Sequence, residues 1–73
     1  MKYVAVVERG ETGWGAYVPD LPGCVAVAPT RDMVERMIRE AIPLHIKSLR
    51  DNGESIPPPA SLVVTIDLAE ASS

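Results

Sequence analysis

The chain has 73 residues, fewer than the roughly 100–150 of a typical domain, so it is predicted to form a single domain with a small core. One cysteine and one histidine provide neither a disulfide pair nor the ligand set of a structural zinc ion. Seven basic and ten acidic residues give a net charge of −3, which disfavours a surface for nucleic-acid phosphates and favours a protein partner. The apolar runs at 3–7 and 24–28 are too short for a membrane span or a signal peptide, so a cytoplasmic location is expected.

Three short strands are predicted at the start of the chain. Residues 2–8 are rich in Val and end at a Gly-rich polar stretch, which indicates a strand followed by a hairpin turn. Residues 14–18 form the return strand, which stops at Pro19. A turn with two prolines and a glycine then leads into a third strand at 24–28. Together these segments predict an antiparallel three-stranded meander.

One helix is predicted from the N-cap Thr30 to about Asn52, where Gly53 suits a left-handed C-cap. Pro43 lies in its polar sector, where water can reach the carbonyl that loses its partner, so one kinked helix is predicted rather than two. The opposite sector is apolar and is predicted to pack on the sheet. It contains Val34, Met37, Ile38, Ala41, Ile42, Leu44 and Leu49.

The last predicted element is a strand over 61–68, where apolar and polar residues alternate after the stiff connector Pro57-Pro58-Pro59. The order β-β-β-α-β predicts an α+β fold with strand order 3-2-1-4, in which the last strand runs parallel to the first and one helix covers one face. The other face is left without cover and therefore needs a partner. Residues 1–73 are predicted to be one domain, with an ordered core at 2–68 and a tail at 69–73.

Three side chains are candidates for an interface. Trp14 and Tyr17 are three residues apart, which places them on opposite faces of an ideal strand, so one of them is predicted to lie on the uncovered face as an anchor. His45 lies in the apolar sector of the helix and is predicted to be a core or interface residue, not a catalytic one.

A metal-dependent nuclease would require several carboxylates to converge on one point. The candidates are Glu8, Asp67 and one of the helix residues Glu35 and Glu40. If the apolar sector packs on the sheet, both helix glutamates point away from it and cannot meet the strand carboxylates. No catalytic, metal or cofactor site is therefore predicted.

The run from Trp14 to Cys24 resembles the signature of the HicB-like antitoxin family, with the turn Pro19-Asp20-Leu21-Pro22-Gly23-Cys24 as its most specific part. Further similarity is found at 3–8, at Thr30, at 41–46, and at Gly53 with Ile56-Pro57, so the resemblance spans nearly the whole chain.

The resemblance implies a partial ribonuclease H-like fold and a non-enzymatic antitoxin that neutralises a HicA-type mRNA interferase by covering its active site. It also implies a homodimer or larger homo-oligomer. The turn at 19–24 either touches the toxin or only shapes the chain. Many members of the family add a C-terminal DNA-binding module; none is expected after Leu68, so direct DNA binding is not expected. The alternatives are a stand-alone oligomeric module that binds a protein or ligand, and a metal-dependent nuclease.

Overall fold

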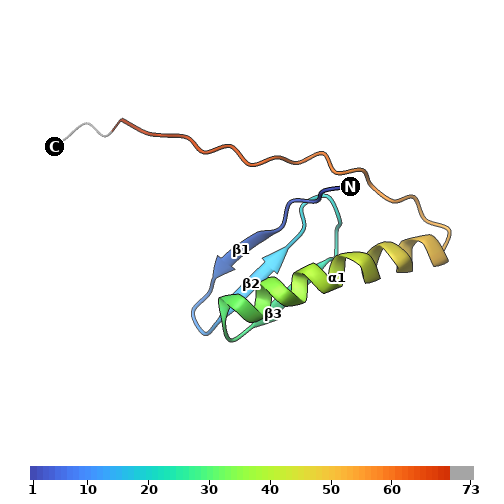
Figure 1. Ribbon diagram of the computed structural model, residues 1–73, viewed down its shortest axis with the longest axis horizontal. Helices are drawn as coiled ribbons and strands as arrows, with labels where there is room; N and C mark the ends of the chain where they lie inside the picture. The colour runs from blue at the N-terminus through green and yellow to red at the C-terminus, as the bar shows by residue number, and fades with distance from the viewer. Residues whose placement is uncertain (70–73) are drawn as a thin grey trace.

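The computed structural model describes residues 1–69. Within them, strands β1 (Val6–Arg9), β2 (Trp14–Tyr17) and β3 (Val25–Ala28) form an antiparallel sheet in the order β1-β2-β3, and helix α1 (Arg31–Asp51) follows (Figure 1). The predicted α+β class, with a meander before one helix, is thereby confirmed. The first strand is shorter than predicted, since pairing starts at Val6. Of the predicted tail at 69–73, residues 70–73 lie outside the described part of the chain.

The register of β2 with its two neighbours divides the sheet into two unlike faces. Ala16 is paired with Ala26, and both are buried on the face toward α1. Tyr17 is paired with Val25, and both are exposed on the opposite face. Small alanine side chains allow the helix backbone to lie close to the sheet, so one face is closed by α1 and the other, the open face, is not.

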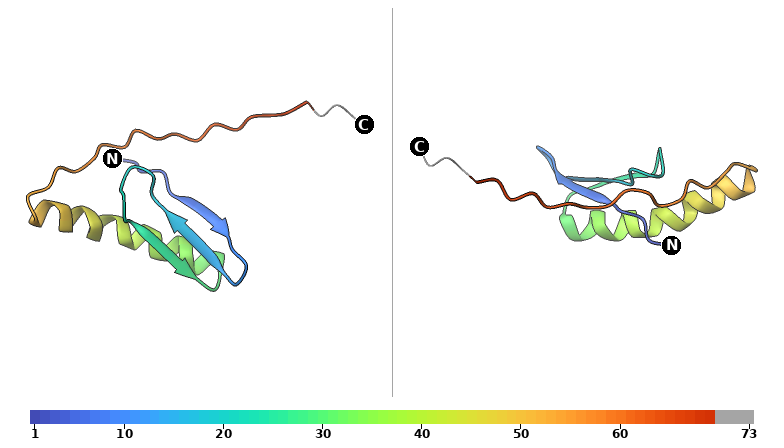
Figure 2. Two further views of the ribbon diagram at one scale, coloured as in Figure 1. Left: turned by 180° about the vertical axis from the view of Figure 1, so that it is seen from behind. Right: turned by 90° about the horizontal axis from the view of Figure 1, so that it is seen from above.

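The core lies between the sheet and α1, which form two layers (Figure 2). Met37 and Leu44, predicted to pack on the sheet, are instead 42% and 67% exposed. The reason is the small size of the sheet: three short strands cover only a narrow stripe of the helix, which also extends beyond the sheet at its C-terminal end (Figure 1). The fully buried positions are Ala16, Val18, Leu21, Cys24, Ala26, Ala28, Val34 and Ile38.

Both ends of α1 follow the predicted capping chemistry. The Thr30 hydroxyl accepts a hydrogen bond of 3.2 Å from the Met33 backbone N–H. At the other end Gly53 has φ of 69°, and its N–H donates to the Arg50 carbonyl, the pattern of a Schellman cap. Pro43 is exposed inside one uninterrupted helix. No helix in residues 1–69 has the apolar length needed to cross a membrane.

The predicted fourth strand does not join the sheet in the single chain. Residues 54–69 contain no strand, and in Figure 1 they run as an extended segment past the N-terminus and beyond the sheet. The radius of gyration is 15.2 Å, against about 11 Å for a compact chain of this length. The alternating pattern indicates strand conformation, but a strand also needs a neighbouring backbone to pair with. The parallel pairing with β1 and the order 3-2-1-4 are therefore absent from the described residues of one chain.

Candidate partner-binding site

The turn at 19–24 is closed by hydrogen bonds within its own backbone. The Val18 N–H donates to the Cys24 carbonyl over 3.1 Å, and the N–H groups of Leu21 and Cys24 donate to Val18 and Leu21 over 3.0 Å each. The Leu21 and Cys24 side chains are buried in the core. Burial also raises the pKa of the Cys24 thiol, so this thiol is a packing group and not an activated nucleophile.

Gly23 brings the turn against the helix. Its φ of 87° lies in the left-handed region, which glycine adopts without strain. A Cβ at this position would stand 3.7 Å from Cε1 of His45. His45 is half-buried. His45 therefore lies beside the turn at 19–24, which we call the signature turn.

Asp20 attaches the extended residues 61–68, which we call the C-terminal segment, to this turn. Its Oδ2 accepts hydrogen bonds of 2.8 Å from the backbone N–H groups of Ala60 and Ser61, and its Oδ1 accepts one of 2.9 Å from the Ser61 hydroxyl. The backbone hydrogen bonds from Ser61 and Ala60 hold the pKa of the Asp20 carboxyl below its ordinary value. A second tie is the hydrogen bond that the Tyr3 hydroxyl donates to the Pro57 carbonyl. We refer to these contacts of Asp20 and Tyr3 as the C-terminal clasp.

Sequence reasoning missed the clasp. It identified Asp20 only as part of a turn and Ser61 as the start of a strand, and it assigned no role to Ala60. The partners are 40 and 41 residues apart, and no local pattern in a single sequence reports a contact over such a separation.

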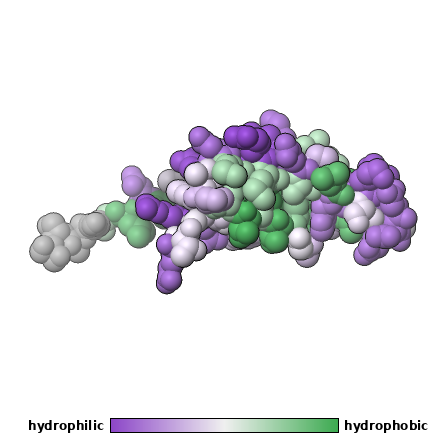
Figure 3. Space-filling model, turned by 90° about the horizontal axis from the view of Figure 1, so that it is seen from below, coloured by the Kyte–Doolittle hydropathy of each residue, from purple (hydrophilic) through white to green (hydrophobic). Residues whose placement is uncertain are grey.

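The open face of the sheet carries an exposed apolar surface. Tyr17, Val25 and Val27 are 42%, 64% and 76% exposed. Gly15 lies between Glu8 and Val27 in the register and has no side chain, which leaves a hollow of about 350 Å³. Seen from below in Figure 3, hydrophobic side chains gather in the middle of the folded body, and hydrophilic side chains lie along its upper edge and at its right-hand end.

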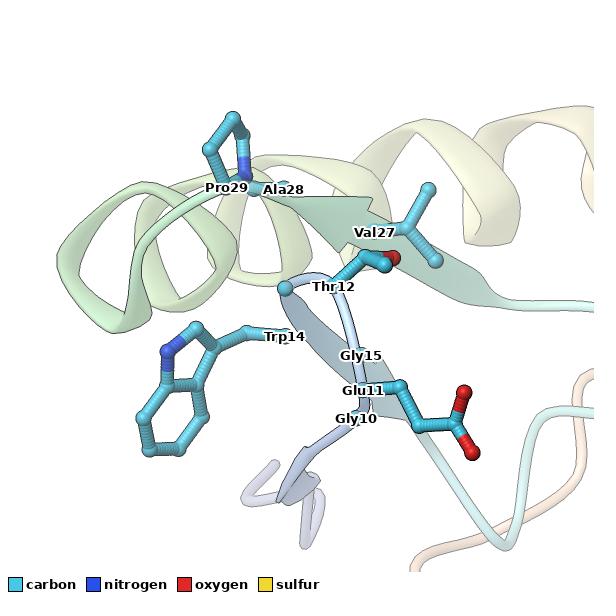
Figure 4. Close-up of a pocket in the computed structure, with 9 residues that line it drawn as sticks. Gly10, Glu11, Thr12, Trp14, Gly15, Val27, Ala28 and Pro29 are labelled. Atoms are coloured by element: carbon cyan, nitrogen blue, oxygen red, sulfur yellow. The ribbon is translucent and has the colours of Figure 1, made fainter.

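A larger hollow of about 510 Å³ lies at the end of the sheet (Figure 4). The β1–β2 turn, with Glu11 and Thr12, lines it together with Val27 and Pro29. In Figure 4 the side chains of Trp14 and Val27 point to opposite sides, as expected from their places on opposite faces. The two hollows share Gly10, Gly15 and Val27, so they form one continuous surface. We call the patch made by Gly15, Tyr17, Val25 and Val27 the open-face patch.

The two aromatic candidates separate as their spacing predicts. Tyr17 lies on the open face, whereas Trp14 is half-buried and packs against the core from the helix side. Of the two, Tyr17 is therefore the side chain that lies on the face not covered by α1. Trp14 also lines the hollow at the end of the sheet.

The carboxylates considered for a nuclease are spread over separate elements. Glu8 is exposed on β1, Glu35 forms an ion pair of 2.9 Å with Arg31 on the helix surface, and Asp67 lies in the extended C-terminal segment. Among the residues that the structure describes, no three His, Cys, Asp or Glu side chains are grouped closely enough to hold a metal ion. The geometry offers a surface for binding and no assembled acidic centre.

Known proteins are similar to this chain in sequence, and one solved structure is similar in fold. The family model for the HicB-like antitoxin of bacterial toxin-antitoxin systems matches residues 3–72. A UPF0150 protein of Thermoplasma acidophilum is 38% identical over 58 residues, covering 78% of this chain and 84% of that protein. A UPF0150 protein of Helicobacter pylori is 35% identical over 68 residues, covering 92% and 94%. A chain of the solved HicA3 and HicB3 toxin-antitoxin complex superposes with a TM-score of 0.68 at 28% identity, covering 81% of this chain and 70% of that chain.

Proposed function

The chain belongs to the family of HicB-like antitoxins, and we propose that it binds and neutralises a toxin of the HicA type, an mRNA interferase. The observation that carries this proposal is the likeness to a chain of a solved toxin-antitoxin complex, which extends over most of the chain at 28% identity. Neutralisation here is stoichiometric binding, not catalysis. The protein acts in the cytoplasm, where its toxin meets mRNA.

The open-face patch is the surface that we assign to the toxin. It combines an exposed aromatic, Tyr17, with the exposed side chains of Val25 and Val27 around the hollow at Gly15. Aromatic anchors beside a hollow are typical of the energetic centre of an interface. The acidic residues Glu8 and Glu11 line the two hollows, together with one basic residue, Arg9. With the net charge of −3, they favour association with a basic, RNA-binding protein.

The signature turn has a structural role in this proposal. Leu21 and Cys24 are buried, Gly23 provides the left-handed backbone beside His45, and Asp20 holds the C-terminal segment. Pro19 and Pro22 are exposed and stiffen the turn. The turn thus shapes the chain next to the open face, and toxin contact is assigned to the strands. Direct contact with DNA forms no part of the proposed function, since the acidic balance disfavours phosphate binding.

The proposal is tested with the toxin-like product of the neighbouring gene. The two proteins should co-purify, and the purified chain should suppress cleavage of a labelled mRNA by that product. A neighbouring protein that cleaves RNA but is neither bound nor inhibited would overturn the antitoxin role. An isolated gene with no such neighbour would instead support the stand-alone binding module.

The surface assignment is tested separately by charge substitution. Val25→Glu with Val27→Glu places two carboxylates in the open-face patch and should weaken toxin binding by at least tenfold in calorimetry, roughly 1.4 kcal/mol or more. The matched control is Leu44→Glu, because Leu44 is 67% exposed on α1, away from the sheet. Wild-type affinity in the strand variant, or an equal loss in the control, would refute this choice of surface.

A further inference from the structure

A groove runs along β1 on the side of the sheet that α1 covers. The helix lies mainly over β3 and β2 and makes less contact with β1. The groove of about 390 Å³ has Tyr3, Ala5 and Val7 on one side and Ile38 and Ile42 of α1 on the other, and the charged residues Glu35 and Arg39 of α1 line it as well. Of the five apolar and aromatic residues, Ile38 is buried and the other four are half-buried. β1 is an edge strand of the sheet, so both its backbone edge and the groove beside it, with its apolar side chains, are open.

The C-terminal segment has the complementary features. Along residues 61–68, Leu62, Val64, Ile66 and Leu68 alternate with Val63, Thr65 and Asp67, so one side of the extended chain is wholly apolar and the other is mixed. The four apolar side chains are 64–78% exposed. One apolar side and one mixed side are typical of an edge strand whose first face packs on a helix and whose second face lies on the open side of the sheet. At about 3.3 Å per residue, the segment is long enough to run beside residues 3–9.

The C-terminal clasp determines where this segment goes. Asp20 fixes the backbone at Ala60 and Ser61, and Tyr3 holds Pro57. The three consecutive prolines at 57–59 lie within the clasp, from the residue that Tyr3 holds to the one before Ala60, and they resist bending. From the clasp the segment leads away from its own sheet, as Figures 1 and 2 show. Its apolar side is thus presented outward from the body of its own chain.

We propose that two copies of the chain exchange residues 61–68, each segment adding a fourth strand to the β1 edge of the other copy. Leu62, Val64, Ile66 and Leu68 of one copy then fill the groove beside β1 of its partner. The occupant is a second copy because the groove and the segment occur once in every chain. In a two-fold exchange the segment of each copy occupies the groove of the other copy, so no groove is left empty and no segment is left unpaired. The exchange also protects the β1 edges and the exposed strand from further pairing.

This assembly is independent of the proposed toxin contact. The exchange uses the β1 edge and the groove under α1, whereas the open-face patch lies on the other face of the sheet. It can therefore be tested on the chain alone, without any toxin, and its failure would leave the antitoxin proposal standing.

The direct test uses the full chain at micromolar concentration. Sedimentation should give twice the chain mass of 7.8 kDa. In an equal mixture of isotope-labelled and unlabelled chains, filtered NMR spectra should show contacts from the Ile66 methyls of one chain to Ile38 and Ile42 of the other. A monomer overturns the proposal, including one in which Ile66 contacts Ile38 of its own chain. A dimer that shows contacts only among Tyr17, Val25 and Val27 also overturns it.

A pair of variants separates the groove side of the segment from its other side. Val64→Lys with Ile66→Lys should raise the dimer dissociation constant by about 100-fold or more, because both charges would have to be buried against the apolar side chains of the groove in place of two apolar groups. Val63→Lys with Thr65→Lys adds the same charge on the opposite side and should leave the dimer intact. Since the segment is exposed in the single chain, the folded body should survive both changes, which the amide spectrum of α1 verifies. Equal dissociation by the two variants, or by neither, would contradict the exchange.

Discussion

Asp20 and Ser61, separated by 41 residues, are joined by two hydrogen bonds: the Ser61 N–H donates to Oδ2 over 2.8 Å and the Ser61 hydroxyl donates to Oδ1 over 2.9 Å. Both oxygens of one carboxylate are therefore engaged by the first residue of the C-terminal segment. The acidic residue of the family signature thus has a structural task, which is to set the point and direction at which this segment leaves the folded body.

Replacing Asp20 by Asn should release the segment while leaving the body folded. The neutral amide presents one acceptor oxygen instead of two charged ones, so the hydrogen bonds from the Ala60 and Ser61 backbone N–H groups lose their charge assistance, and the NH₂ group can only donate toward the Ser61 hydroxyl. Hydrogen exchange at these two backbone N–H groups should accelerate, with little change in the melting temperature. Asp51→Asn is the matched control, since Asp51 only pairs with Lys47 on the exposed surface of α1. Unchanged exchange at Ala60 and Ser61 would show that the clasp does not restrain the segment.

Acidification should open the clasp below the ordinary pKa of an aspartate. Because the backbone hydrogen bonds from Ser61 and Ala60 lower the pKa of Asp20 from 3.8, the ionised form is the one that the folded chain favours. Its contribution is fully present above pH 3.8 and is lost as the pH falls through the lowered pKa. NMR titration of the Asp20 carboxyl carbon should give a midpoint below 3.8, and protection of the Ala60 N–H should fall with it. A midpoint at or above 3.8 would contradict this result.

Gly23→Ala should destabilise the fold by about 1–2 kcal/mol through backbone strain. The left-handed φ of 87° is the cause, because a Cβ there would make only an ordinary contact of 3.7 Å with His45. The melting temperature should fall by about 4–8 °C for each kcal/mol. Gly10→Ala is the control, since φ at Gly10 is not positive and its Cβ would lie 3.5 Å from the Gly13 carbonyl oxygen. An equal loss in both variants would indicate that crowding, not backbone conformation, is responsible.

Val34→Ala should cost about 2 kcal/mol of unfolding free energy, because it removes buried methyl groups and leaves a cavity between α1 and the sheet. Val34 is fully buried, whereas Val27 on the open face is 76% exposed. The same substitution at Val27 should therefore change stability by less than about 0.5 kcal/mol. Urea denaturation of both variants measures the difference. Similar costs at the two sites would mean that the open face is covered in solution.

Elements governed by near neighbours were predictable. Thr30 and Gly53 mark the helix ends because capping bonds reach only a few residues along the chain. The exposure of Met37 and Leu44 could not be predicted in this way. The periodicity places both on the apolar side of the helix, but the width and length of the sheet decide how much of that side is covered.

The sequence by itself determined the α+β class, the order of the meander and the helix, and the family, because these depend on local propensity and on motifs of contiguous residues. Only the tertiary structure decided that Asp20 holds Ala60 and Ser61, and that residues 61–68 leave the sheet without a partner in their own chain. An alternating pattern states which side of a strand is apolar. It does not state which backbone edge will pair with the strand, since that edge is assembled from distant parts of the chain and is open to a second copy.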